Sequence, residues 1–370
     1  MSANKTKTLK EIVRNQGVIK GIFAILKYRL PTPLNGYISL LETEINNRYP
    51  VELTIKQRIK AFTLGFTSQE YCYYGIKTGI DPKLYLSELD RFTYTRNINK
   101  NPNILNDKKK FYDYMGEKGN RNYLPKFLGM VKSKTFIGKH NIDYYLHVSK
   151  KVVVKPSSGG EGEGLYFIEN VGGNIFVNGE KKNLTVFLST LSDENYIVTE
   201  YCKQANFLSE IYPFTANTIR IWTMTPNGEE PFIPNAVLRI GTKESGFTDN
   251  RSQGGLVAEI DLKTGKLSAA AETLANGNIK WHDYHPDTGS RIKNSVIPEW
   301  DSFLNQFRDI LSLMPELKYV GWDILLTEKD CEFVFIEGNS HPIPISLQVH
   351  RPLLEDPRVK KFYLENGVPV

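Results

Sequence analysis

Three residues near the carboxyl end have the side chains to hold a metal ion: Asp323, Glu337 and Asn339. They lie in the stretch GWDILLTEKDCEFVFIEGNSHPIPISLQ, residues 321–348. Two apolar runs, WDILL and FVFIE, flank a polar turn, which is typical of an antiparallel hairpin. Centring the turn on Asp330 places Asp323 directly opposite Glu337, where Cβ atoms are roughly 5 Å apart. Asn339 follows two residues later, so its side chain points to the same face as that of Glu337.

The same register predicts two further pairs nearer the turn, Thr327 with Phe333 and Leu326 with Val334. Hard divalent cations such as Mg²⁺ take oxygen ligands of the kind that the Asp, Glu, Asn set offers, and leave positions for substrate phosphates. Acidic residues on the solvated face of a sheet are also ordinary. The hairpin alone therefore leaves a metal site and a wet sheet face both open.

A second candidate site is the glycine-rich stretch KVVVKPSSGGEGEGLYFI that begins at Lys151. Lys155 lies at the end of a short strand that is predicted to be buried, and Pro156 ends that strand. The loop that follows contains Ser158, Gly159 and Gly160 and precedes another strand. Glycines let backbone N–H groups approach phosphate oxygens, and a lysine at the strand end adds positive charge. Hairpin turns also need glycine for their geometry, so the loop by itself does not establish a phosphate site.

Lysines at the start of a helix form a third candidate. In NDKKKFYDYMGEKGN either Asn106 or Asp107 can cap a helix that Gly119 ends. Lys108 then lies in the first turn, where the helix dipole disfavours cations. A neighbouring anion would explain this placement, and a solvated helix face is the alternative.

Two arginines, Arg220 and Arg239, fall inside the apolar strands predicted for NTIRIWTM and NAVLRIGT. A buried guanidinium needs an anionic partner. An internal salt bridge satisfies that need as well as a bound substrate does, so both interpretations stay open for each arginine.

The remaining elements position these residues. Residues 37–90 are expected to be helical, with a capping box at Thr67 and Glu70 starting a new helix. The run IDYYLHV is predicted to be a strand, and YIVTEY another that ends at Glu200. From Pro298 an amphipathic helix is expected, with an apolar face that serves core packing.

Composition limits the class of protein. A chain of 370 residues with 40% hydrophobic and 24% charged residues is typical of an ordinary globular protein. Its net charge of +6 favours anionic ligands such as nucleotides, and no motif for nucleic-acid binding is present. Three widely spaced cysteines, Cys72, Cys202 and Cys331, indicate neither a disulfide framework nor a CxxC metal site. With no signal-like start or long apolar run, we expect a cytoplasmic protein.

The N-terminal segment contains a basic amphipathic stretch at residues 18–26, with apolar residues Val18, Ile22, Phe23, Ile25 and Leu26. Such a helix can associate weakly with an anionic membrane surface, although packing against its own domain is commoner.

Taken in order, NDKKKF, VVVKPSSGGEGEG, IVTEYC, WDILL and FIEGN resemble the ATP-grasp superfamily over roughly residues 100–350. The elements ILNDK, NTIRIWT, LRIG and DNRSQGG are similar to the sugar-transfer-associated ATP-grasp proteins. This resemblance implies an α+β ATP-grasp fold: two α+β subdomains that clamp ATP, with an antiparallel sheet in the C-terminal part. The expected divisions are a helical region at 1–100, an ATP-grasp domain at 101–350 that divides into 101–203 and 204–350, and a tail at 351–370.

The resemblance also implies roles for particular residues. Lys108 and Lys155 match the two nucleotide-binding lysines, and Ser158, Gly159 and Gly160 belong to the flexible loop over the phosphates. The hinge that holds adenine and ribose matches Glu200, Tyr201 and Cys202. The magnesium ligands match Asp323, Glu337 and Asn339. Arg239 matches the arginine that steadies the transferred phosphoryl group, with Arg220 and Asn250 as further catalytic candidates.

The function that the resemblance implies is an ATP- and Mg²⁺-dependent carboxylate–amine ligase that works through an acyl phosphate. Its substrates are expected to come from surface-glycan assembly, for example an amino acid joined to a sugar acid or an amino sugar. The alternatives are a phosphotransferase that acts on a hydroxyl and a non-catalytic nucleotide-binding protein, because a fold does not by itself establish an activity.

Overall fold

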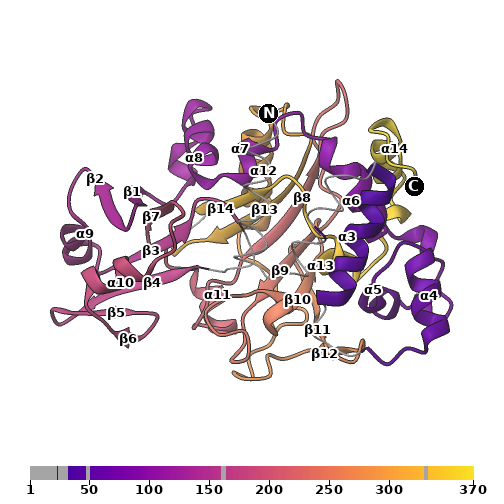
Figure 1. Ribbon diagram of the computed structural model, residues 1–370, viewed down its shortest axis with the longest axis horizontal. Coiled ribbons are helices and arrows are strands. Elements are labelled where there is room, and N and C mark those ends of the chain that lie inside the picture. The colour runs from indigo at the N-terminus through magenta and orange to yellow at the C-terminus, as the bar shows by residue number, and fades with distance from the viewer. Residues whose placement is uncertain (1–22, 24–31, 47–50, 160–163, 329–331) are drawn as a thin grey trace. The chain divides into compact units, whose positions relative to one another are not determined.

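The structure is a computed structural model that describes residues 23, 32–46, 51–159, 164–328 and 332–370. The chain divides into two compact units (Figure 1). Unit 1 comprises residues 1–98, 273–280 and 343–370, and unit 2 comprises residues 99–272 and 281–342. No helix among the described residues is both long and apolar enough to cross a membrane.

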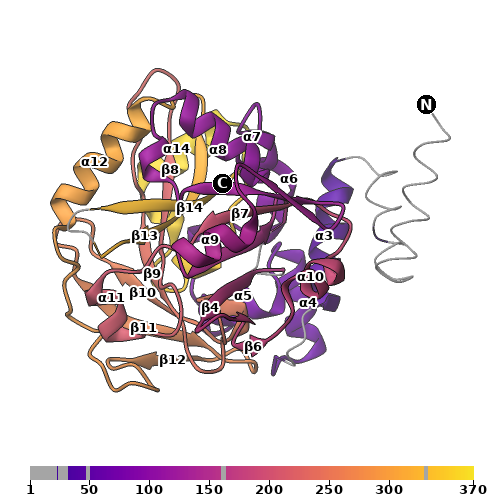
Figure 2. The same ribbon diagram turned by 90° about the vertical axis from the view of Figure 1, so that its left-hand side faces the viewer.

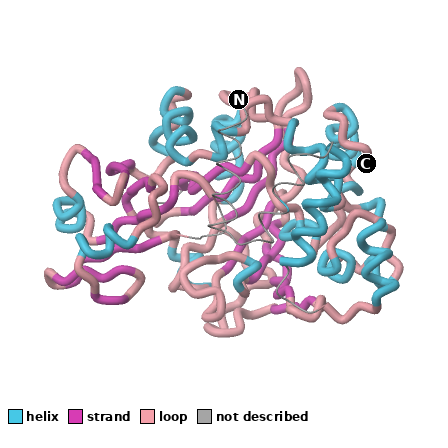
Figure 3. Tube along the Cα trace, viewed as in Figure 1, coloured by secondary structure: helices cyan, strands magenta, loops and turns pink. Residues whose placement is uncertain are grey.

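Unit 1 is largely helical, as Figure 3 shows for residues 32–94. Its α-helices are α3 (Thr32–Asn46), α4 (Ile55–Thr63), α5 (Ser68–Tyr73), α6 (Glu88–Tyr94), α13 (Ile345–Gln348) and α14 (Pro357–Glu365). Short 3₁₀ turns are η1 (Ile76–Thr78), η2 (Pro82–Leu84), η3 (Thr95–Asn97) and η6 (Leu353–Glu355). The capping box that the sequence predicts at Thr67 is confirmed, since Thr67 accepts from the backbone of Glu70 and the Glu70 carboxylate accepts in return.

The C-terminal residues belong to unit 1 because their side chains complete its core. Gln348 is buried, accepts a hydrogen bond from the backbone N–H of Leu86 at 2.8 Å and donates to the Leu86 carbonyl at 3.1 Å. Phe362 and Tyr363 of α14 are fully buried. The sequence divided the chain at residues 101 and 351, and it did not anticipate that residues 343–370 group with the N-terminal helices.

The chain forms two antiparallel seven-stranded sheets, whose residues belong to unit 2 except for Thr273, Ile279 and Lys280 of the second sheet. The first has the strand order β2-β1-β7-β3-β4-β5-β6. Its strands are β1 (Phe127–Lys132), β2 (Thr135–Gly138), β3 (Lys151–Pro156), β4 (Tyr166–Val171), β5 (Asn174–Val177), β6 (Glu180–Lys181) and β7 (Tyr196–Glu200). Helices α9 (Ile142–Val148) and α10 (Leu184–Thr190) pack their apolar residues against Val152, Val154 and Val198 of this sheet.

The prediction of a strand at IDYYLHV is wrong, because these residues form helix α9. Asn141 caps it by accepting from the backbone N–H of Tyr144 at 2.8 Å. Ile142 and Leu146, four residues apart, are both buried. Aromatic and β-branched content favoured a strand, but the cap and the four-residue apolar spacing dominate.

The second sheet has the order β12-β11-β10-β9-β8-β13-β14. Its strands are β8 (Ile219–Met224), β9 (Ala236–Ile240), β10 (Leu256–Ile260), β11 (Leu267–Thr273), β12 (Ile279–His282), β13 (Tyr319–Leu326) and β14 (Phe333–Asn339). The other helices of unit 2 are α7 (Asn103–Asn106), α8 (Lys108–Glu117), α11 (Asn206–Ile211) and α12 (Trp300–Ser312), with 3₁₀ turns η4 (Arg121–Tyr123) and η5 (Arg251–Gln253).

The amphipathic helix predicted after Pro298 is confirmed as α12, which packs against β13 and β14 (Figure 2). Phe303 lies 4.9 Å from Phe333, and Phe307 lies 5.9 Å from Phe335, measured between ring centroids. These aromatic contacts hold the β13–β14 hairpin that carries the predicted metal ligands.

Candidate functional site

The β13–β14 pairing places Asp323 opposite Glu337, as the sequence predicted, but by a different register. Near the turn the pairs are Leu326 with Phe333 and Leu325 with Val334, so the predicted Thr327–Phe333 and Leu326–Val334 pairs are wrong. The register then shifts between Asp323 and Ile324. This irregularity leaves Ile336 outside the pairing, as in a β-bulge, and restores the Asp323–Glu337 pair.

The carbonyl of Ile336 accepts a hydrogen bond of 3.1 Å from the ammonium of Lys155, which comes from the end of β3. The bulge thus offers an acceptor to a lysine from the other sheet of unit 2. Burial lowers the pKa of Lys155 to about 8, with Lys108 lowering it further and Glu337 opposing the shift. A buried ammonium of this kind gains most from an anionic ligand, because such a ligand would favour its charged form.

Lys108 lies at the first turn of α8, beside the glycine-rich loop. Asp107 caps this helix by accepting from the backbone N–H groups of Lys109 and Lys110 and pairs with Ser158 in an isolated β-bridge. The Lys108 ammonium donates to the Gly159 carbonyl at 2.7 Å and lies 3.7 Å from a Glu337 oxygen. The anion that the sequence argument sought at this position is therefore present within the chain. Gly160 lies outside the described residues.

Both arginines converge on Asp323. Arg220 forms a two-point contact with both carboxylate oxygens. Arg239 lies 3.3 Å from Asp323 and 3.1 Å from Asp249. Burial alone would raise the pKa of Asp323, but Arg220 and Arg239 outweigh it and hold that pKa below its ordinary value. Internal ion pairs thus partner both guanidinium groups in the structure.

Sequence reasoning missed two residues that fix Arg239. Thr218 accepts from the guanidinium through its hydroxyl, at 2.8 and 3.1 Å, and donates that hydroxyl to Asp249 at 2.5 Å. The Thr218 backbone N–H also donates to Asp249, at 2.9 Å. Burial raises the pKa of Asp249, with Arg239 and Thr218 opposing the shift. The sequence does place an acid, Asp249, directly before the candidate residue Asn250 in DNRSQGG, and this acid could have been considered as a partner for a buried arginine.

The predicted hinge residues are less closely connected with this cluster. The carboxylate of Glu200 accepts from the backbone N–H of Lys126 at 3.0 Å. The ring of Tyr201 lies 4.4 Å below the ammonium of Lys151. Burial raises the pKa of the Cys202 thiol to about 12, with Glu200 adding to the shift and Lys155 opposing it.

Asn250 caps the short turn η5 with its backbone. Its carbonyl accepts from the N–H groups of Gln253 and Gly255, each at 3.0 Å. A Cβ at Gly255 would meet the Asp249 carbonyl oxygen at 2.5 Å, so only glycine fits there. The turn therefore holds the backbone of Asp249 and Asn250 in place beside Arg239.

Residues 88–360 match the model of the sugar-transfer associated ATP-grasp proteins. The chain belongs to this family. Its fold is accordingly an α+β ATP-grasp fold, here with two antiparallel sheets and N-terminal helices, as the resemblance had implied. A comparison with curated proteins finds no match.

Solved structures similar to this ATP-grasp chain share little of its sequence. A RiPP-associated ATP-grasp ligase from Chryseobacterium gregarium is 14% identical, with 86% of this chain and 72% of that chain covered and a TM-score of 0.41. D-alanine–D-alanine ligase from Bacillus anthracis is 15% identical, with 90% and 94% covered and a TM-score of 0.38. N5-carboxyaminoimidazole ribonucleotide synthetase from Thermotoga maritima is 14% identical, with 64% and 42% covered and a TM-score of 0.32. The chain spans less than half the length of that synthetase.

The family's predicted magnesium ligands fit a hard cation, though not equally. Both oxygens of Asp323 already contact arginines. Asn339 donates its amide N–H groups to the Gly321 carbonyl and to Glu337, while its amide oxygen accepts nothing from the described residues. Among the described residues, the cation nearest to Glu337 is Lys108, at 3.7 Å. Oxygen donors from Glu337 and Asn339 are thus the more accessible ones, and no cluster of three His, Cys, Asp or Glu residues occurs within the described ranges.

Proposed function

We propose that this protein is an ATP-dependent ligase that joins a carboxylate to an amine through an acyl phosphate. The observation that carries the proposal is the convergence of Lys108, Arg220 and Arg239 on the paired carboxylates Asp323 and Glu337, with Lys155 bound to the Ile336 carbonyl next to Glu337. These cations come from separate elements of unit 2, so the fold gathers them at one place. Such a set suits a polyphosphate and a divalent cation together.

The nucleotide would be held chiefly by lysines. Lys155 has a lowered pKa because it is buried, and a phosphate oxygen beside it would stabilise its charged form and accept a charge-assisted hydrogen bond. Lys108 would contribute a second ammonium from the start of α8, with Ser158 and the glycine loop adjacent to it. Adenine and ribose would lie against the chain at Glu200, Tyr201 and Cys202, at the end of β7.

The reaction has two balanced steps. First, a carboxylate oxygen attacks the γ-phosphorus, the bond from that phosphorus to the β-bridging oxygen breaks, and ADP leaves. Then the amine nitrogen attacks the acyl carbon, the carbon–oxygen bond to phosphate breaks, and the nitrogen loses a proton to solvent. Arg239 would donate hydrogen bonds to the phosphoryl oxygens as charge develops on them, because Thr218 and Asp249 hold its guanidinium group in place before substrate binds.

Mg²⁺, when bound through Glu337 and Asn339 with Asp323 near it, would neutralise charge on the β- and γ-phosphate oxygens. Arg220 supports this arrangement by keeping the buried Asp323 ionised. Without such a counter-charge, burial would favour its protonated form.

The substrate class rests on the family, whose description links it to sugar transfer. We propose a sugar acid or an amino sugar as one substrate and an amino acid or similar compound as the other, in the assembly of a surface glycan.

A panel of sugar acids and amino acids, presented with ATP and Mg²⁺, tests the proposal. ADP release that requires both an acid and an amine, with an amide product identified by mass spectrometry, is the expected result. Transfer of phosphate to a hydroxyl of a single substrate would instead make the protein a phosphotransferase.

A further inference from the structure

Helix α3 in unit 1 is apolar on two faces. Its inner face packs against α6, where a Cβ at Gly36 would meet the Thr93 hydroxyl, and Leu40 is fully buried. Its outer face carries four exposed apolar side chains, 38–54% accessible: Leu34, Tyr37, Leu41 and Ile45. At 3.6 residues per turn these four fall within an arc of roughly 80°. They therefore form one continuous apolar stripe.

Helix α4 extends this stripe. Ile55 and Ile59, one turn apart, are 78% and 59% exposed. Phe62 follows on the same face, and its ring centroid lies 5.7 Å from that of Tyr37. We call this set the α3–α4 surface: Leu34, Tyr37, Leu41, Ile45, Ile55, Ile59 and Phe62. Contiguous exposed apolar patches on this scale mark interaction sites more often than scattered residues do.

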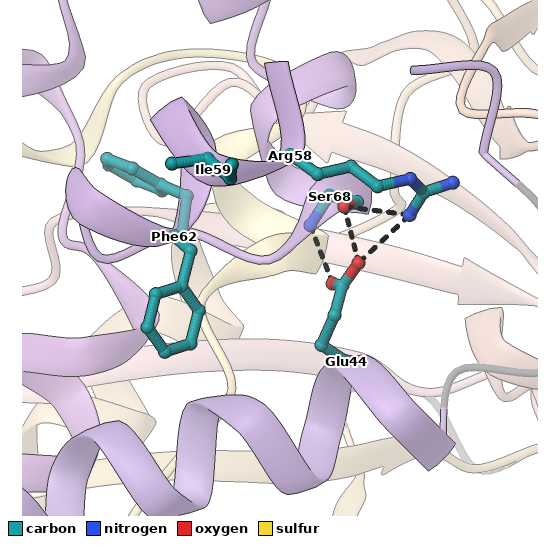
Figure 4. Close-up of a pocket in the computed structure, with 6 residues that line it drawn as sticks. Glu44, Arg58, Ile59, Phe62 and Ser68 are labelled. Atoms are coloured by element: carbon teal, nitrogen blue, oxygen red, sulfur yellow. Dashed lines mark hydrogen bonds and ion pairs between the residues drawn. The ribbon is translucent and has the colours of Figure 1, made fainter. Parts of the chain in front are cut away.

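A hollow of about 240 Å³ opens into this surface (Figure 4). It is lined by Glu44, Arg58, Ile59, Phe62, Phe66 and Ser68. Glu44 accepts from the Ser68 backbone at 2.8 Å and from Arg58 at 3.1 Å, and Arg58 also donates to the Val51 carbonyl. Glu44, Arg58 and Ser68 therefore bond to one another, and the other lining residues, Ile59, Phe62 and Phe66, are apolar.

Positive charge is concentrated next to this surface in the sequence. Residues 1–30, which directly precede α3, contain 7 of the 47 basic residues and 1 of the 41 acidic residues. The other 340 residues thus carry 40 basic and 40 acidic residues, so the whole net charge of +6 belongs to the first 30. Lys56 and Lys60 add exposed ammonium groups on α4 beside Ile55 and Ile59.

We propose that the α3–α4 surface docks on an anionic lipid bilayer, with the basic N-terminal residues and Lys56 and Lys60 attracted to the lipid phosphates. An apolar stripe flanked by lysines is the pattern of an interfacial helix. Each basic residue near an anionic membrane strengthens binding about fivefold, and apolar insertion adds to it. Electrostatic attraction and apolar insertion, each weak alone, together give reversible attachment. This inference does not depend on the ligase activity.

The full-length protein would be mixed with vesicles of pure phosphatidylcholine or of equimolar phosphatidylcholine and phosphatidylglycerol, and the bound fraction measured by flotation. Two variants probe the two interactions. The first combines Ile55→Glu with Ile59→Glu and removes apolar insertion. The second changes Lys10, Arg14, Lys20 and Lys27 to Gln and removes electrostatic attraction. A matched apolar control is Val148→Glu with Val186→Glu, which are 61% and 62% exposed on α9 and α10 of unit 2. A matched charge control changes Lys132, Lys139, Lys181 and Lys263 to Gln, all exposed in unit 2.

We expect binding to the anionic vesicles only, weakened at least tenfold by each probing variant and less than twofold by either control. High salt should weaken binding, since the lipid phosphates are screened. The proposal is overturned if the wild type does not float with anionic vesicles, or if the control variants lose as much binding as the probing ones. It is equally overturned if sedimentation shows a dimer that Ile55→Glu abolishes, because a second copy would then be the occupant.

Discussion

Two buried carboxylates, Glu70 in unit 1 and Asp323 in unit 2, respond to burial in opposite ways. They are 3% and 2% exposed. Burial raises the pKa of Glu70 to about 8, with Glu88 adding to the shift. Burial acts on Asp323 in the same direction, but Arg220 and Arg239 hold its pKa below the ordinary value. The difference lies in the neighbours and not in the depth of burial.

The partners of each acid explain the contrast. Glu70 accepts from the backbone N–H and hydroxyl of Thr67 and from Tyr74, all of which are neutral donors. A protonated Glu70 can keep most of that capping role. Asp323 accepts from two guanidinium groups, which favour the ionised form. Glu70 therefore has a structural role in unit 1, while Asp323 in unit 2 stays charged where chemistry would need a charged acid.

The largest expected effect comes from the paired acids of the site. Glu337→Gln should lower turnover on the order of a thousandfold, because several kcal/mol of charge stabilisation at the phosphates depend on it. The free energy of unfolding of this variant should change by less than about 1 kcal/mol, since the ion pair that it loses, between Lys108 and Glu337, is 3.7 Å long. Asp323→Asn should lose turnover as well and cost roughly 3–5 kcal/mol of stability, because it leaves two buried arginines short of an anion.

Urea unfolding and ADP release, measured on both variants, check this pair. Equal losses of stability in the two variants would show that the ion pairs around Asp323 stabilise the fold no more than the contact at Glu337 does. The proposed role of the arginines in stabilising a charged Asp323 would then be wrong.

Arg239→Lys is expected to lower kcat about a hundredfold with little change in ATP affinity. Lysine keeps the charge but cannot contact Thr218, Asp249 and Asp323 together, so a donor fixed for the transition state is lost. Arg308→Lys, at an exposed position on α12, is the matched control. An unchanged kcat, or a loss accompanied by unfolding in circular dichroism, would leave Arg239 with a structural salt bridge alone.

Lys155 should make ATP binding depend on pH. Its pKa of about 8 means that the ammonium loses its proton as the pH rises past that value, so affinity should fall about tenfold per pH unit above it. Calorimetry should also detect proton uptake on binding near pH 9. Lys155→Arg, which stays charged, should bind ATP with no such dependence; a wild-type affinity that is flat from pH 7 to 10 would rule out Lys155 as a phosphate ligand.

The smallest effect is expected in unit 1. Because the folded protein keeps the Glu70 proton up to a pH of about 8 while an unfolded glutamate releases it near 4.5, this group's contribution to stability declines as pH rises between those values. Glu70→Gln should remove the decline and protect the amides of α5 better than wild type at pH 8.5. Hydrogen exchange with mass spectrometry measures this, with the exposed Glu365→Gln as control. Identical pH profiles in Glu70→Gln and wild type would contradict the neutral-acid account.

The sequence predicted the fold and much of the site, for identifiable reasons. Alternating and apolar runs revealed strands β8, β9, β13 and β14, and the spacing of apolar residues revealed α12. The Asp323–Glu337 pair was correct although the register was not, because the bulge at Ile336 compensated for a turn one residue shorter than assumed. A bulge depends on tertiary contacts, here including the Lys155 hydrogen bond, and has no local signature in this strand.

What the sequence missed depended on distant parts of the chain meeting. Asp249 reads as an ordinary loop acid, and only the fold brings it to Thr218 and Arg239. A buried arginine in an apolar strand is compatible with either a substrate contact or a salt bridge, and both Arg220 and Arg239 do form salt bridges. Ion pairs of this kind still allow a catalytic role, because Arg239 also lies at the acids where the phosphates would bind.

The measurement that tests the ligase proposal most directly follows an oxygen atom. With an acid that supports ADP release, the carboxylate is labelled with ¹⁸O and the inorganic phosphate product is analysed by mass spectrometry. An acyl phosphate intermediate requires that one labelled oxygen leaves with phosphate when the amine attacks, so we expect one ¹⁸O per phosphate formed, and about a thousandfold less labelled phosphate from Glu337→Gln. Phosphate without label, or ADP formed with the phosphate retained on a substrate hydroxyl, would contradict the account.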